Sequence, residues 1–86
     1  MKIGKMWTFS NLKKNAMEYL LAHFSRSRRV VVDDIFSGRT EEIIELEAGA
    51  HIVALGPPCN FTPPSINIIL RDTSPLTPME VVFDPA

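Results

Sequence analysis

The chain of 86 residues is long enough for one domain with one hydrophobic core, and a domain this small buries only about 60 to 65% of its unfolded surface. The hydrophobic fraction of 45% and the charged fraction of 22% are typical of globular chains, and no run approaches the roughly 20 apolar residues that cross a bilayer. The single cysteine, Cys59, excludes an internal disulfide framework and cannot form a structural zinc site by itself.

Charge is unevenly distributed along the chain, although the formal net charge is only −1. Residues 1–29 carry seven basic side chains and one acid, a balance of +6, whereas residues 30–86 carry two basic side chains and nine acids, a balance of −7. Opposite charges attract over about 8 to 10 Å at ordinary salt. We therefore expect the basic head to lie near the acidic body, either within a monomer or across a dimer.

The N-terminal part of the chain predicts a helix. Residues 1–9 lack the pattern of a secretory signal, which predicts a cytoplasmic product. Ser10 is a suitable N-cap, and the apolar residues after it recur at intervals of three and four. This spacing predicts an amphipathic helix from about Asn11 to Phe24, followed by the basic connector SRSRR at residues 25–29.

The stretch from Val30 to Leu55 holds β-forming runs separated by turn residues. Residues 30–32 are three valines, which favour a strand, and the aspartates after them favour a turn. Gly38 is expected at a hairpin turn and Gly49 at the next turn, with apolar runs at residues 43–46 and 51–55. Two further strands, at residues 65–70 and 79–83, lie between proline-bearing loops.

Five such strands predict a mainly β domain, a small antiparallel sandwich-like sheet. The one helix is expected to pack on this sheet, because a helix of this length is marginal alone in water, and the chain is α+β if that helix is counted. The chain is then a single domain, with residues 1–29 as an N-terminal segment with a basic helix and residues 30–86 as the β module.

The turn and strand spacing resembles that of the PEGA domain family, which are small all-β modules. The matching positions span Val30 to Phe83, and those that carry the likeness are Val30, Val32, Asp33, Gly38, Thr40, Leu46, Gly49, Ala50, His51, Val53 and Leu55. The resemblance implies a β-sandwich-like interaction module and brings no catalytic residue with it. In such a module Asp33, Gly38, Gly49 and His51 are structural turn residues.

No converging catalytic set is visible in the sequence. The two histidines, His23 and His51, are expected in different elements, and no nucleophile accompanies either. Acids at positions 33, 34, 41 and 42 could offer oxygen ligands to a divalent cation, but the spacing of an EF-hand loop is absent and a solvated turn is the preferred interpretation. We therefore expect a protein that is not an enzyme, with no cofactor, no metal and no small-molecule substrate.

Two binding surfaces are expected. The valines Val30, Val31 and Val32 have no flanking proline, so this strand is predicted to be an open edge that binds a protein partner or a second copy of the chain. The alternative is an adaptor whose basic residues bind nucleic acid or an anionic membrane surface, namely Lys13, Lys14, Arg26, Arg28 and Arg29. The first is favoured because nine acids in the body would repel a polyanion. The sequence thus predicts a non-enzymatic interaction or structural module that acts through its β edges and N-terminal helix.

Overall fold

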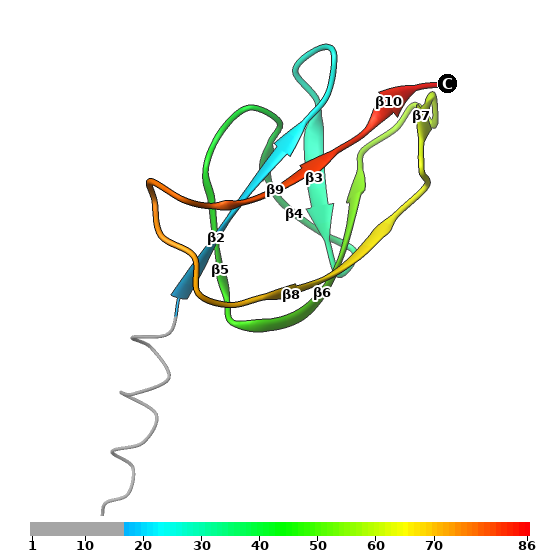
Figure 1. The fold of residues 1–86 in the computed structure, drawn as a ribbon. Coiled ribbons are helices and arrows are strands. Elements are labelled where there is room, and N and C mark those ends of the chain that lie inside the picture. The colour runs from blue at the N-terminus through cyan, green and yellow to red at the C-terminus, as the bar shows by residue number, and fades with distance from the viewer. Residues whose placement is uncertain (1–16) are drawn as a thin grey trace, which may run out of the picture.

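The computed structural model describes residues 17–86, and within them the chain is mainly β. The strands follow one another along the chain in Figure 1 as β2 (Met17–His23), β3 (Arg29–Val32), β4 (Ile35–Arg39), β5 (Ile44–Glu47), β6 (Gly49–Leu55), β7 (Phe61–Thr62), β8 (Ile66–Leu70), β9 (Met79–Val82) and β10 (Asp84–Pro85). These residues include no helix that could serve as a membrane span.

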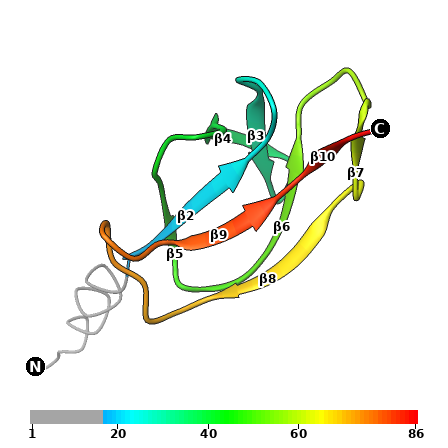
Figure 2. The same cartoon turned by 45° about the horizontal axis from the view of Figure 1, so that its top comes forward.

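Two sheets share one hydrophobic core. The first has the strand order β5-β2-β9, the second has the order β4-β3-β6-β8, and β7 pairs with β10 in a short third sheet. Strands β2 and β9 run in parallel, as Figure 2 shows, whereas the other pairs are antiparallel. The core draws on both larger sheets and consists of Leu20, Ala22, Phe24, Val30, Val32, Ile44, Val53, Leu55, Ile68, Leu70, Val81 and Phe83. The expected single antiparallel sheet of five strands is therefore wrong.

The helix predicted from Asn11 to Phe24 is also wrong where it can be tested, because residues 17–23 form strand β2. Its first six residues, with Lys13 and Lys14, lie outside the described residues. Burial along β2 has a period of two, with Leu20, Ala22 and Phe24 inside. The apolar residues of this segment fit the period of a helix as well as the period of a strand. Hydrogen bonding to β5 on one side and to β9 on the other stabilises the strand. Since β2 is the central strand of its sheet, residues on both sides of position 30 belong to one packed unit.

The valine strand is not an edge. Strand β3 pairs with β4 on one side and with β6 on the other, so the interface predicted at residues 30–32 has no open backbone. Val30 and Val32 are core residues, and Val31 is half-buried on the opposite face. The edges of this sheet are β4 and β8.

The hairpin turn lies earlier in the chain than the sequence predicts. Asp33 and Asp34 join β3 to β4 with φ values of 52° and 69°, the left-handed pair typical of a tight hairpin turn. Gly38 instead lies within β4, where an added Cβ would come within 2.7 Å of Ile44 Cγ1. Gly49 begins β6 with a φ of 122°, a conformation that side chains rarely adopt.

Candidate functional site

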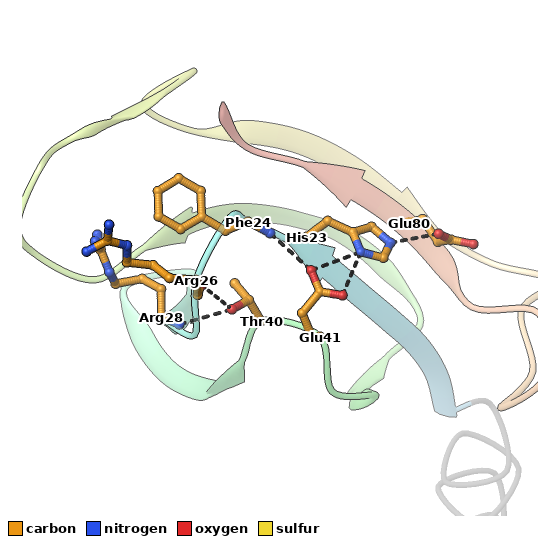
Figure 3. Close-up of polar contacts among 7 residues, drawn as sticks. All are labelled: His23, Phe24, Arg26, Arg28, Thr40, Glu41 and Glu80. Carbon is orange, nitrogen blue, oxygen red and sulfur yellow. Dashed lines mark hydrogen bonds and ion pairs between the residues drawn. The ribbon is translucent and has the colours of Figure 1, made fainter. Parts of the chain in front are cut away.

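His23 lies between two glutamates that come from other segments of the chain. Its Nδ1 is 3.0 Å from Oε1 of Glu41, which precedes β5, and its Nε2 is 2.7 Å from Oε1 of Glu80 on β9 (Figure 3). The hydrogen bond with Glu80, and then that with Glu41, raises the pKa of His23 above its ordinary value. Both ring nitrogens are therefore engaged by carboxylates of the chain itself.

Glu41 holds the end of β2 in a second way. Its Oε2 accepts a hydrogen bond from the N–H of Phe24 at 3.2 Å (Figure 3), and its own N–H donates to the carbonyl of Ala22 at 2.8 Å. Together with the pairs to His23, these bonds join β2, β9 and the segment before β5. We call the cluster of His23, Glu41 and Glu80 the brace.

His51, on β6 of the four-stranded sheet, also has both ring nitrogens engaged. Its Nδ1 is 2.7 Å from Oδ2 of Asp33, and its Nε2 is 2.7 Å from the carbonyl oxygen of Glu47. Burial opposes protonation, but Asp33 and Glu47 outweigh it, so the pKa of His51 is raised. The same contact with His51, with a backbone bond from Ile52, lowers the pKa of Asp33. These two residues fasten the hairpin turn to β6.

Arg28 is buried, so it is not free to bind the external anion that the alternative adaptor role requires of it. Its Nη1 donates to the carbonyl oxygens of Gly56 and Pro58 at 3.3 and 2.9 Å, and to Oδ1 of Asn60 at 3.0 Å. Its Cζ lies 5.1 Å from the centre of the Phe24 ring. Arg28 therefore holds the loop at residues 56–60 against the core.

Four other arginines, Arg26, Arg29, Arg39 and Arg71, are exposed, and two of them face one another. Arg29 on β3 lies directly opposite Arg39 on β4, so both side chains project from the same side of the sheet. The Cζ of Arg29 is 5.6 Å from the centre of the Phe36 ring, and the Nε of Arg39 donates to Oγ of Ser27 at 3.1 Å. Arg26 is exposed in the loop before β3, and its carbonyl oxygen accepts a hydrogen bond from the hydroxyl of Thr40 (Figure 3). Within residues 17–86, none of these arginines has an acid within 4.0 Å.

The side of the four-stranded sheet that faces away from the core is largely apolar, and we call it the outer sheet face. Register and burial place on it Val31, Phe36, Ala50, Ile52, Ala54, Asn67 and Ile69. Three of its large side chains are more than half exposed, at 59% for Phe36, 53% for Ile52 and 60% for Ile69. A shallow depression of about 450 Å³ lies between β6 and β8, lined by Ala50, His51, Ile52, Asn67, Ile68 and Ile69.

Sequence reasoning missed this face and missed Arg39. The segment Ile66–Leu70 could have indicated this face. Its apolar residues occupy both even and odd positions, and in a strand these positions point to opposite faces of the sheet. The opposition of Arg29 and Arg39 depends on the hairpin register, which a turn placed at Gly38 would not give.

The described residues offer no metal centre. Nowhere in residues 17–86 do three side chains of histidine, cysteine, aspartate or glutamate meet in a way that could hold an ion. Asp33 and Glu41, two of the acids considered above, are engaged by His51 and His23. Cys59 is exposed in the loop that Arg28 holds.

No family model matches the chain, and no curated protein or solved structure matches it either. The function must therefore be argued from the described surfaces.

Proposed function

We propose that this chain is a non-enzymatic protein-binding module, and that the outer sheet face is the surface that contacts the partner. The observation that carries the proposal is the exposure of Phe36, Ile52 and Ile69 on one side of one sheet. Exposed apolar side chains that gather on one face mark interaction sites far more often than single exposed ones do. The PEGA-like residues between Val30 and Leu55 agree with an interaction role.

Side-chain chemistry favours binding over catalysis. His23 and His51 both have their ring nitrogens engaged by groups of the chain itself. The depression between β6 and β8 is shallow and lined mainly by aliphatic side chains, which suits apolar side chains of a protein partner.

A protein partner suits this surface better than nucleic acid does. Residues 17–86 carry five arginines and ten acids, a balance of −5, which repels a polyanion over most of the surface. Arg28 is buried, so the basic segment contributes fewer free cations than its sequence suggests. The partner we propose is a protein segment that presents apolar side chains to the outer sheet face.

Selection of displayed random peptides of about a dozen residues against the immobilised chain tests this proposal. We expect enriched peptides to bind the parent and to bind the double variant Ile52→Asp, Ile69→Asp at least about tenfold more weakly, since charges on an apolar contact surface must be desolvated. Both positions are exposed, so the core stays intact, and thermal unfolding checks this. The matched control is Val82→Asp, at a position 56% exposed on β9 of the other sheet.

Two results would count against the proposal. Peptides that bind the double variant as well as the parent would place the contact elsewhere. Light scattering that finds a dimer abolished by the same two substitutions would assign the face to a second copy of the chain instead.

A further inference from the structure

The two facing arginines have a repulsive arrangement that the chain itself does not relieve. Like charges directly opposite one another on neighbouring strands are destabilising. Arg29 and Arg39 are in this position, and no acid of residues 17–86 lies within 4.0 Å of either. Residues 1–16 contain no acid at all. An anion supplied from outside would remove this repulsion.

The contacts of the two guanidinium groups direct them toward opposite ends of the β3-β4 pair. Arg29 lies against the Phe36 ring, and Arg39 is held through its Nε by Ser27. The terminal nitrogens of Arg39 have no hydrogen-bond partner among the described residues. Each guanidinium group can therefore donate hydrogen bonds to a carboxylate of its own.

The arginine pair is continuous with the outer sheet face. Phe36 contacts Arg29 and lies opposite Val31 on that face, and Val31 lies opposite Ala54 on β6. Counting residues and strands from Arg29 to Ile69 gives a diagonal of about 20 Å across the sheet, roughly the length of six or seven residues of extended chain.

We infer that Arg29 and Arg39 each bind one carboxylate, an arrangement we call the clamp, and that the partner of the outer sheet face is a protein segment with acidic side chains at one end and apolar side chains along the rest. This inference rests on the proposed function, because it names the chemistry of the segment that the outer sheet face binds. The charge of the pair complements acids, and the aliphatic depression complements the apolar remainder.

Titration with two defined peptides tests the clamp. The acidic probe is Glu-Glu-Thr-Ile-Ser-Val-Asn-Leu, and its neutral match is Gln-Gln-Thr-Ile-Ser-Val-Asn-Leu, both with blocked ends. The full chain is the parent, with Arg29→Gln, Arg39→Gln as the test variant and Arg26→Gln as the control on a third exposed arginine. We expect the acidic peptide to bind the parent about tenfold more tightly than the neutral one, and this advantage to vanish in the test variant and at high salt.

The results separate the clamp from the binding face. If neither peptide binds the parent, or if the acidic peptide has no advantage, the clamp is wrong, while the displayed-peptide selection still decides the face independently. If both peptides bind and only the double variant Ile52→Asp, Ile69→Asp lowers their affinity, the outer sheet face is supported as the binding surface and the clamp is not. Phosphatidylserine vesicles or a single-stranded oligonucleotide that bind more tightly than the acidic peptide, and lose binding in the test variant, would overturn the inference in favour of a lipid or nucleic acid.

Discussion

Gly38 on β4 lies so close to Ile44 on β5 that a Cβ at position 38 would come within 2.7 Å of Ile44 Cγ1. Ile44 is buried in the core, so it has little room to move. Glycine is therefore required at position 38 by the close approach of the two sheets and not by the conformation of a turn.

Gly38→Ala should lower the free energy of unfolding by about 1 to 3 kcal/mol, the usual cost of overpacking. Urea denaturation measures the loss. The same substitution should cost less in an Ile44→Ala background, because that change removes the Cγ1 and Cδ1 atoms that lie nearest the added Cβ. A Gly38→Ala variant as stable as the parent would show that the sheets can separate at this point without cost.

Arg28 is predicted to stabilise the fold and not to bind a partner. Arg28→Met retains the aliphatic stem but removes the donor to the Gly56 carbonyl and to Oδ1 of Asn60, and one of two donors to the Pro58 carbonyl, so we expect a loss of about 1 to 3 kcal/mol. Arg26→Met, at an exposed position, should change stability by less than about 0.5 kcal/mol. Equal stability of the two variants in urea would contradict the structural role assigned to Arg28.

The histidines should make stability fall as pH rises. The pKa values of His23 and His51 are raised in the folded state from an ordinary value of 6.5. Their contribution is fully present below that value and is lost as pH rises through the folded pKa values. The pKa of Asp33 is lowered from 3.8, so its contribution is present above that value and is lost as pH falls through the folded pKa.

Urea midpoints measured across pH test this dependence. His23→Gln should reduce the fall in unfolding free energy at alkaline pH by about 0.2 to 1 kcal/mol, a small amount because the brace is exposed and screened. His51→Gln should leave the contribution of His23 to this fall unchanged. High salt should reduce the effect. A parent chain whose midpoint stays constant from about pH 6 to 9 would show that the brace contributes nothing.

Local pattern located most of the strands. The apolar runs at residues 30–32, 51–55, 66–70 and 79–82 all lie in strands, because alternation and β-branching mark a pleated surface locally. Residues 17–23 were predicted to be helical because their apolar residues fit the helical period as well as the strand period. Their strand conformation depends on pairing with β9, which lies far along the chain. The sequence pattern within residues 17–23 gives no indication of a parallel partner at residues 79–82.

The candidate sites depend on register, which the sequence does not state. His23, Glu41 and Glu80 come from three separate segments, so their meeting could not be predicted. The pair Arg29 and Arg39 could have been predicted if the turn expected at residues 33 and 34 had been taken as the hairpin turn, since aspartate tolerates the left-handed conformation. The prediction of a hairpin turn at Gly38 placed the reversal too late in the chain.

The most direct test of the outer sheet face as a protein-binding surface is a titration of the isotope-labelled chain with an enriched displayed peptide, followed by amide chemical shifts. We expect the largest shifts at Val31, Phe36, Ile52 and Ile69, with little change on β2, β5 and β9. Shifts confined to β2, β5 and β9, with none at those four residues, would contradict the account.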